Sequence, residues 1–204
     1  MYLSSKKMIK RLFDLSCSLI GIIILSPLLL IISILVKIGS RGPIFYRSTR
    51  IGKGKKPFKL YKFRTLVSNA DKIGGPSTSD DDPRMTGVGK FLRKYKLDEL
   101  PQFFNVIKGE MSLVGPRPEI PEYAKLYNKK EQIIFDVKPG ITDLASIWNS
   151  NEGALLKGSK DPEKEYLEKI RPKKVKLQIQ YIQEKSFIGD LKIILKTLRK
   201  IFHK

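Results

Sequence analysis

The chain has 204 residues, and its 40 Lys and Arg residues outnumber its 20 Asp and Glu residues, for a formal net charge of +20 at pH 7. This length allows one domain with a hydrophobic core and some appendages. The charge predicts an anionic partner, which could be nucleic acid, a phosphorylated substrate or anionic lipid. The single cysteine, Cys17, excludes a disulfide framework, and the single histidine, His203, argues against histidine bases and zinc sites. Any chemistry must therefore use carboxylates, hydroxyls, Lys, Arg and a bound ion.

Residues 15–36 carry no charge, and as a helix they would be about 33 Å long, enough for a hydrocarbon core of about 30 Å. Ser26 and Pro27 lie near the middle of this segment, where a proline kinks a helix. Both flanks are basic, and the positive-inside rule then places both on the cytoplasmic side; the basic residues are Lys6, Lys7, Lys10, Arg11, Lys37 and Arg41. The pattern predicts a re-entrant membrane helix-break-helix, with a kinked transmembrane helix as the alternative.

The next part of the chain predicts a small β-hairpin. Residues 44–47 and 58–65 favour two short strands around a Gly/Lys loop, and residues 68–87 have the composition of a loop. Residues 175–183, "VKLQIQYIQ", alternate with period two like a strand, although their length and lysines also permit a helix.

Several helices are also predicted. Thr86 and Asp161 have the positions of N-cap residues, and Asp98 is expected to be the N-cap of a helix that ends at Gly109. The C-terminal segment from residue 187 is predicted to be a basic amphipathic helix; its apolar residues are Phe187, Leu191, Ile194, Leu195, Leu198, Ile201 and Phe202. Such a helix suits the headgroup layer of an anionic membrane, or it packs on its own domain with a solvated basic face.

The stretch with most chemistry is residues 97–118, "LDELPQFFNVIKGEMSLVGPRP". Asp98 and Glu99 are adjacent, so on a helix they diverge by roughly 100° and do not flank one bond as a glycosidase pair does. They could share one ion, or they could act as nucleophile and helper on one centre. The expected helix N-terminus would bind phosphate and keep Asp98 ionised, while helix capping alone is the simpler interpretation.

Basic residues near this acidic pair predict phosphate binding. Arg93 lies about one turn before Asp98, Arg117 stands between Pro116 and Pro118, and Lys62 and Arg64 lie on the second predicted strand. These cations could clamp phosphate oxygens. The set suits Mg²⁺-assisted attack on a phosphate, with the metal held by Asp98 and Glu99.

These residues also carry a resemblance to a known family. The chain resembles the bacterial sugar transferases, the monotopic polyprenyl-phosphate phosphoglycosyl transferases, in their small single-domain form. The resemblance covers nearly the whole chain and rests on these stretches: "KRLFD", Ser26-Pro27, "PIFYRSTRIG", "FKLYKFRT", "DPRMTGVGKFLRKYKLDELPQFFNVIKGEMSLVGPRP", "KPGIT" and the C-terminal helix.

The resemblance implies a reaction. Members of the family move a phosphosugar from a nucleotide (UDP) diphosphate sugar to polyprenyl phosphate and so begin the synthesis of a membrane-linked glycan. By resemblance, Asp98 matches the nucleophile that forms a phosphosugar-aspartyl intermediate with release of UMP, Glu99 matches its partner acid, and Mg²⁺ is the required ion. Arg93 and Arg117 fall on phosphate-binding positions, and Ser26-Pro27 implies a re-entrant hairpin. Residues 143–153, "DLASIWNSNEG", depart from the family pattern, since Asp143 replaces a glycine and Ser146 a glutamine.

The sequence also allows two other functions. Asp80 and Asp82 could form the Asp-x-Asp metal site of a glycosyltransferase that releases UDP, although they lie in a Gly/Ser/Pro-rich loop. A non-enzymatic, membrane-anchored basic protein could bind nucleic acid or lipid, but no zinc spacing or nucleic-acid recognition pattern is evident, so no nucleic-acid partner is expected.

The sequence therefore predicts an α+β fold that is mainly helical, with a re-entrant membrane hairpin in residues 1–40 and a catalytic domain in residues 41–204 with a small β-hairpin and amphipathic interfacial helices. The expected partners are a UDP-sugar donor, a polyprenyl phosphate acceptor and anionic membrane lipids, and a homodimer is a further candidate assembly. The expected location is the cytosolic face of the bacterial cytoplasmic (inner) membrane.

Overall fold

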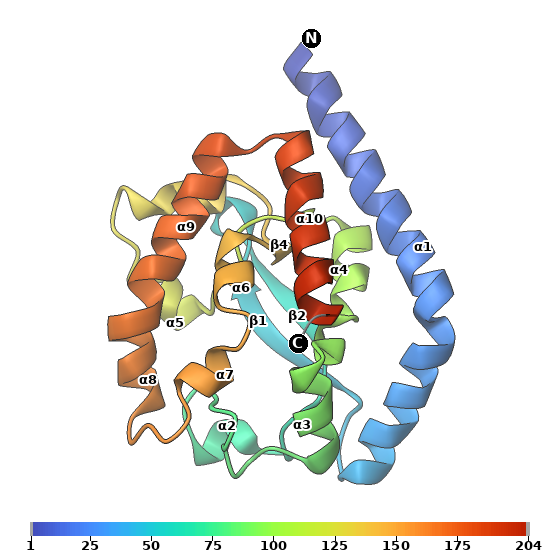
Figure 1. The fold of residues 1–204 in the computed structure, drawn as a ribbon, viewed down its shortest axis with the longest axis vertical. Helices are drawn as coiled ribbons and strands as arrows, with labels where there is room; N and C mark the ends of the chain where they lie inside the picture. The colour runs from blue at the N-terminus through green and yellow to red at the C-terminus, as the bar shows by residue number, and fades with distance from the viewer. Residues whose placement is uncertain (1, 203–204) are drawn as a thin grey trace.

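The structure is a computed structural model that describes the backbone of residues 2–202 and the side chains of residues 7–201, so His203 lies outside the described residues. It is mainly helical with two small sheets, which confirms the α+β prediction (Figure 1). In chain order the elements are α1 (Tyr2–Gly39), β1 (Phe45–Ile51), the 3₁₀ turn η1 (Lys53–Lys55), β2 (Pro57–Phe63), α2 (Ala70–Ile73), α3 (Gly87–Lys94), the 3₁₀ turn η2 (Leu97–Glu99), α4 (Gln102–Lys108), β3 (Ser112–Val114), α5 (Pro121–Ala124), the 3₁₀ turn η3 (Glu131–Asp136), β4 (Gly140–Thr142), α6 (Leu144–Trp148), α7 (Glu152–Leu155), α8 (Pro162–Glu165), the π-helical turn η4 (Tyr166–Ile170), α9 (Arg171–Glu184) and α10 (Phe187–Phe202).

The predicted hairpin is present. Strands β1 and β2 pair antiparallel in a register that sets Phe45 opposite Phe63 and Ile51 opposite Pro57. A second sheet, which the sequence did not predict, pairs β3 with β4 in parallel. Strand β3 follows α4, which contacts β2 of the hairpin, and β4 leads directly into α6.

Helix α1 corrects one part of the membrane prediction, because it runs from Tyr2 to Gly39 without the predicted break at Ser26-Pro27. A proline lacks the N–H that would bond to the carbonyl four residues earlier, here that of Ile23. The Ser26 hydroxyl donates to this same Ile23 carbonyl over 2.8 Å, so the carbonyl keeps a partner and the helix continues. Figure 1 shows α1 bending part-way along its length, as expected of a helix with an internal proline.

Polar contacts bind both ends of α1 to the rest of the protein. Near its start, Arg11 donates to the carbonyls of Val106 (2.6 Å) and Ile107 (2.9 Å) at the end of α4. Asp14 accepts a hydrogen bond from the hydroxyl of Ser112 over 2.8 Å. At its end, α1 is capped by the Arg64 side chain, described below. The helix therefore lies across the body of the protein and is held at both ends.

The middle of α1 has the character of a membrane segment. Residues Lys7–Gly39 form a helix long and apolar enough to cross a bilayer, with a mean hydropathy of 3.0 over its most apolar stretch, of which 11% is buried inside the protein. Its exposed apolar side chains are Met8, Ile9, Leu12, Leu19, Ile20, Ile23, Ile24, Leu30, Ile31, Ile34, Leu35 and Ile38. A surface of this extent is unfavourable in water, so the chain associates with a membrane.

The largest hydrophobic core lies between the hairpin, the second sheet and helices α9 and α10. Val106, Met111 and Val114 are at its centre, and Tyr181 and Ile182 reach it from α9. The ambiguous segment 175–183 is thus a helix in the structure, because its buried residues follow helical spacing rather than alternation.

Helix α10 packs against α6 and the second sheet. This favours the interpretation that the helix packs on its own domain with a solvated basic face. Ile193 and Asp190 are buried, and the Tyr181 hydroxyl donates to Asp190 over 2.8 Å. Ile188 and Leu195 are nevertheless 66% exposed, so part of the apolar face remains uncovered.

Candidate active site

The two predicted catalytic carboxylates lie in a tight turn between α3 and α4. Helix α3 starts as predicted, since the Gly89 N–H bonds to the Thr86 hydroxyl over 2.9 Å, and ends before Lys96, whose positive φ of 58° reverses the chain. Asp98 and Glu99 follow in η2 and are only 6% and 9% exposed. The prediction that Asp98 is an N-cap is wrong, because α4 begins at Gln102 after Pro101. The 3₁₀ turn at η2 instead directs both carboxylates inward.

Both carboxylate oxygens of Glu99 are bonded to cations. Lys62 Nζ, from β2, lies 2.8 Å from Glu99 Oε1, and Arg117 donates from Nη1 to Oε2 over 3.1 Å and from Nη2 to Oε1. Burial acts to raise the pKa of Glu99, but the attraction of Arg117 and Lys62 outweighs burial and holds that pKa well below its usual range. Glu99 is therefore a permanent carboxylate that orients two cations.

Asp98 has a different environment. Its Oδ2 is 3.7 Å from Lys62 Nζ, and its buried Oδ1 has no hydrogen-bond partner within the described part of the chain. Burial raises the pKa of Asp98 against the attraction of Lys62, and the negative charge of Glu99 raises it further. This corrects the expectation that a helix terminus keeps Asp98 readily ionised. A buried carboxylate oxygen without a partner is costly, so Asp98 Oδ1 is ready to interact with a ligand.

A cavity of about 770 Å³ opens above this turn. Asp98, Glu99, Lys62, Arg93 and Arg117 line one side of it. Apolar side chains line another side and come from α1, α4 and α10; they include Phe13, Ile24, Leu25, Phe103, Ile194 and Leu198. The cavity thus combines a charged base with an apolar wall that continues onto the membrane helix.

The other predicted binding residues do not line this cavity. Arg64 is buried at the end of α1, where its guanidinium donates to the carbonyls of Val36, Ser40, Arg41 and Pro43 and to the Ser40 hydroxyl. Its five donors are then in use, so the prediction that Arg64 clamps phosphate is not supported by its position.

The two prolines around Arg117 shape the backbone rather than the cavity surface. Pro116 and Pro118 are both buried. The Pro116 carbonyl accepts from the Gly140 N–H (3.0 Å), and the Pro118 carbonyl accepts from Arg50 Nη1 (3.3 Å). Their effect is to hold the turn that presents Arg117 to Glu99.

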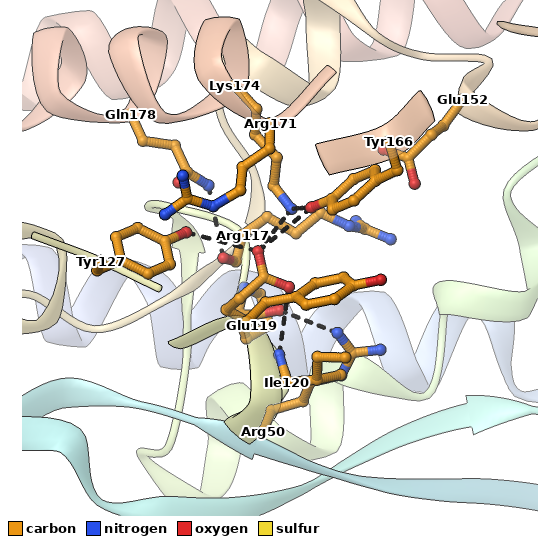
Figure 2. A network of polar contacts seen from close by, with 12 residues as sticks. Arg50, Arg117, Glu119, Ile120, Tyr127, Glu152, Tyr166, Arg171, Lys174 and Gln178 are labelled. Atoms are coloured by element: carbon orange, nitrogen blue, oxygen red, sulfur yellow. Dashed lines mark hydrogen bonds and ion pairs between the residues drawn. The ribbon is translucent and has the colours of Figure 1, made fainter. Parts of the chain in front are cut away.

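A buried network behind Arg117 was missed in the sequence (Figure 2). Lys174 Nζ, from α9, lies 2.9 Å from Glu119 Oε2 and donates to the Tyr166 hydroxyl over 2.6 Å. One turn further along α9, Gln178 Nε2 donates to the Arg117 carbonyl over 3.5 Å. Lys174 and Gln178 are four residues apart, a signal that appears only once 175–183 is recognised as a helix.

Asp143, at the start of the segment that departs from the family pattern, is fully buried. Its Oδ1 accepts from the Ser146 N–H over 2.6 Å and caps α6, while its Oδ2 accepts from the Arg117 N–H over 3.3 Å. Asp143 therefore links Arg117 to α6. The sequence could have predicted this helix N-cap, because Asp143 stands three residues before Ser146, the spacing between an N-cap residue and the N–H that it accepts from.

The Asp-x-Asp alternative is not supported by the loop geometry. Asp82 accepts hydrogen bonds from the backbone N–H and the guanidinium of Arg84, so it holds the loop together. Asp80 lines the cavity, and its backbone N–H donates to the Gly153 carbonyl over 3.0 Å. The two aspartates do not share a site.

Of the two carboxylates, only that of Asp98 has an oxygen available for Mg²⁺. The described residues contain no group of three or more His, Cys, Asp or Glu side chains placed to hold a metal. Mg²⁺ often binds through one or two carboxylates together with substrate phosphates. The free Asp98 Oδ1 fits such a site, whereas both oxygens of Glu99 are bonded to cations.

Comparison with known proteins agrees with this geometry. The model of the bacterial sugar transferase family matches residues 5–204. The chain is 43% identical over 198 residues to the UDP-glucose:undecaprenyl-phosphate glucose-1-phosphate transferase of Klebsiella pneumoniae, a match that covers 95% of this chain and 40% of the relative. It is 35% identical over 198 residues to the UDP-N-acetylgalactosamine-undecaprenyl-phosphate N-acetylgalactosaminephosphotransferase of Aeromonas hydrophila, covering 95% of this chain and 43% of the relative.

A relative of similar length is the sugar transferase EpsL of Bacillus subtilis, with 37% identity over 193 residues, 95% of this chain and 87% of the relative. The chain spans less than half of the two longer relatives and most of the shorter one. The match of the family model extends from the first turns of α1 to residue 204, and it includes every residue of the carboxylate turn and its cations. The chain therefore belongs to the bacterial sugar transferase family.

Proposed function

We propose that the chain transfers a sugar phosphate from a UDP-sugar to polyprenyl phosphate, releases UMP and so begins the synthesis of a membrane-linked glycan. The observation that carries this proposal is the unpartnered Asp98 Oδ1 at the base of the cavity, beside cations that could bind a diphosphate. The names of the Klebsiella and Aeromonas relatives, both transferases of a sugar phosphate to undecaprenyl phosphate, support the reaction class.

In the first step, a carboxylate oxygen of Asp98 attacks the phosphorus that bears the sugar. A new O–P bond to Asp98 forms as the P–O bond to UMP breaks, and UMP leaves with the bonding electron pair. Lys62 and Arg117 offset the negative charge on the transferring group. Because Glu99 holds both cations by ion pairs, its role is to position them rather than to attack.

In the second step, an oxygen of polyprenyl phosphate attacks the same phosphorus. The O–P bond to Asp98 breaks, the carboxylate is regenerated, and the product is a polyprenyl diphosphate sugar. Two substrates that react in turn at one carboxylate give ping-pong kinetics. The apolar wall formed by α1 and α10 is suited to the lipid end of this acceptor.

Magnesium enters the proposal at the same turn. Asp98, with Glu99 alongside, would hold Mg²⁺ together with substrate phosphates, where the ion would offset phosphate charge.

The proposal also includes a location. Because Arg11 and Asp14 near one end of α1 and Arg64 near the other end contact the same body, both ends of the helix belong on one side of a membrane. The basic flanks favour the cytosolic side of the bacterial inner membrane, with anionic lipids as neighbours. The proposal also includes association of two copies of the chain. A measurement of the oligomeric state tests this part.

The test is UMP release from a panel of UDP-sugars in the presence of undecaprenyl phosphate. Asp98→Asn is expected to lower turnover on the order of a thousandfold or more, because the amide is not a nucleophile. With donor alone, intact-protein mass spectrometry should find one sugar phosphate added to the unaltered chain and none on the Asp98→Asn variant.

Asp136→Asn is a matched control, since Asp136 is an exposed carboxylate outside the cavity. Substantial UMP release from Asp98→Asn would contradict the assigned nucleophile. Release of UDP in place of UMP would instead favour the glycosyltransferase alternative.

A further inference from the structure

Residues 143–153, where the chain departs from the family pattern, supply part of the wall of the cavity. Ser146 on α6, Asn149 just after it and Glu152 on α7 are among the residues that line the cavity from this segment. The carboxylate turn supplies charges for phosphates, whereas this wall offers mainly neutral hydrogen-bonding groups.

The wall is held firmly by the rest of the protein. Asp143 caps α6 through the Ser146 N–H. From α10, Lys200 Nζ donates to the Ile147 carbonyl over 2.5 Å. At its far end, the Gly153 carbonyl accepts from the Asp80 N–H over 3.0 Å. Side chains on this wall therefore have defined positions before any ligand binds.

Two buried polar atoms on the wall lack a partner. The Ser146 hydroxyl oxygen and Asn149 Oδ1 make no hydrogen bond within residues 7–201, for which side chains are described. Asn149 Nδ2 donates to Glu152 Oε2 over 3.1 Å. Since a carboxylate only accepts, this contact fixes the amide orientation and leaves Oδ1 as the acceptor without a donor. Buried groups of this kind are uncommon in folded proteins and need an explanation.

The wall also lies close to the reacting centre. Arg117, which is bonded to Glu99, has its pKa raised chiefly by Glu99 and additionally by Glu152 and Asp143. Glu152 and its partner Asn149 thus share the surroundings of Arg117. The phosphorus that Asp98 would attack bears the sugar, so the sugar would lie in the same cavity that this wall lines.

We propose that Ser146 and Asn149 bind the sugar of the donor and select among donors, with Asn149 Oδ1 accepting a hydrogen bond from a sugar hydroxyl or acetamido N–H. This inference rests on the proposed function. Asn149 Oδ1 and the Glu152 carboxylate are both acceptors, so the wall favours neutral sugars rich in O–H or N–H groups. It disfavours sugars that carry a carboxylate, which would meet Glu152 with like charge.

The test compares UMP release from UDP-glucose, UDP-galactose, UDP-N-acetylglucosamine, UDP-N-acetylgalactosamine and UDP-glucuronic acid. The unaltered chain is expected to use a neutral sugar best. Ser146→Ala and Asn149→Ala should each lower kcat/KM for that sugar by about tenfold, the effect of one lost hydrogen bond. The ratio of kcat/KM between that sugar and its C4 epimer should move towards one, and inhibition by UMP should stay unchanged.

The ratio does not depend on how much of a preparation is active, so a purely structural defect would leave it unmoved. Ser146→Ala removes only an atom that has no partner among the described residues, so its thermal stability should equal or exceed that of the unaltered chain. Asn149→Ala also removes the hydrogen bond to Glu152, so a small loss of thermal stability is expected for that variant. Gln180→Ala is a matched control, because the Gln180 carboxamide is exposed on α9 and contacts only Glu184 among the described residues.

The outcomes separate the two proposals. Turnover by the unaltered chain with an unchanged donor ratio in both variants would overturn the inference alone. Equal weakening of UMP inhibition and of all donors would assign these atoms to the nucleotide and would also overturn it. If the unaltered chain turned over no UDP-sugar, the proposed function would fail, and the inference would fail with it.

Discussion

Asp98 and Glu99 are neighbours in the chain, yet their carboxylates differ because two cations face mainly one of them. Lys62 and Arg117 are bonded to Glu99, and Asp98 Oδ1 has no partner among the side chains that the structure describes. The pKa of Glu99 is lowered and that of Asp98 is raised as a result of burial and these charges. Two adjacent acids thus have different environments, and in the proposed mechanism one holds cations while the other is the reactive group.

The pH profile of activity is predicted to report Asp98. Attack requires the carboxylate, so kcat/KM should fall as the pH drops through the raised pKa of Asp98. In Glu99→Gln the loss of a nearby negative charge lowers that pKa, and the acid limb should move to lower pH. In Lys62→Met the loss of a nearby positive charge raises it, and the limb should move to higher pH. UMP release measured against pH checks both directions.

Both variants are expected to lower activity near neutral pH, so the position of the acid limb is the diagnostic quantity. Lys59→Met on the same strand is the control, because Lys59 is exposed and bonds to Thr49. Limbs that move in the same direction in Glu99→Gln and Lys62→Met would show that another group titrates.

At the scale of elements, Arg64 shows how far a local pattern can mislead. Lys62 and Arg64 were both placed on the second predicted strand as candidate phosphate ligands. Arg64, however, meets the end of α1, and carbonyls at and just after that end, together with the Ser40 hydroxyl, accept from all of its guanidinium donors. Only the path of the chain through space distinguishes a phosphate clamp from a helix cap.

Arg64→Met is predicted to destabilise the fold by about 3 kcal/mol, because several carbonyls at the end of α1 lose a charged donor. The KM for donor should stay close to that of the unaltered protein, because Arg64 does not line the cavity. Thermal unfolding in detergent and steady-state kinetics check the two parts.

The matched variant is Arg47→Met, an exposed arginine on β1 whose guanidinium lies 5.1 Å from the Tyr61 ring centre. Its expected cost is below about 1 kcal/mol. A large rise in donor KM for Arg64→Met without loss of stability would restore the phosphate-binding interpretation.

The Ser26-Pro27 pair in α1 gives a second prediction at this scale. Ser26→Ala removes the hydroxyl that satisfies the Ile23 carbonyl, and it should cost about 1 kcal/mol or more in an apolar environment. In a Pro27→Ala background, the restored N–H of residue 27 bonds to that carbonyl, so the same Ser26→Ala change should cost almost nothing.

Thermal stability of the four combinations in lipid nanodiscs measures this dependence as a double-mutant cycle. Ser33→Ala is a useful control, since Ser33 bonds to the Leu29 carbonyl in a part of α1 without proline. Equal costs for Ser26→Ala in both backgrounds would mean that the hydroxyl does not compensate for Pro27.

For the whole molecule, the contacts at both ends of α1 predict the topology. With Cys17 replaced by Ser, cysteines introduced by Lys7→Cys and Lys53→Cys should lie on the same side of the membrane, since both positions are exposed near the body. A membrane-impermeant maleimide should label both in inverted vesicles and neither in spheroplasts.

A periplasmic cysteine in a co-expressed marker protein is the control for spheroplast labelling. Labelling of positions 7 and 53 from opposite sides would mean that α1 crosses the membrane, and would contradict the arrangement of its two ends.

Much of the molecule was predictable from its sequence because the decisive signals are local. The apolar segment, the hairpin, the Thr86 cap and the Gly109 helix end depend on residues close together in the chain. The second sheet has strands of only three residues, too short for any periodicity. The Asp98 turn was placed incorrectly because a left-handed Lys96 cannot be anticipated from composition.

The same distinction between local signals and contacts across the fold applies to the site. Lys62, Arg93 and Arg117, which lie in stretches that carry the family resemblance, line the cavity. Lys174, Gln178 and Asp143 were missed because their roles depend on contacts across the fold. The difference between the two carboxylates likewise depends on burial, which a sequence pattern does not contain.

The attachment of α1 at both ends has a consequence for how the protein is made. Asp14 bonds to Ser112, and Lys10 Nζ lies 2.7 Å from Asp190, so this helix leaves the ribosome well before the residues that it contacts. Until those residues are made, the apolar helix lacks the surface on which it docks. We therefore expect the helix to enter lipid before the rest of the fold is complete, so that the later residues fold beside a helix that already lies in the membrane.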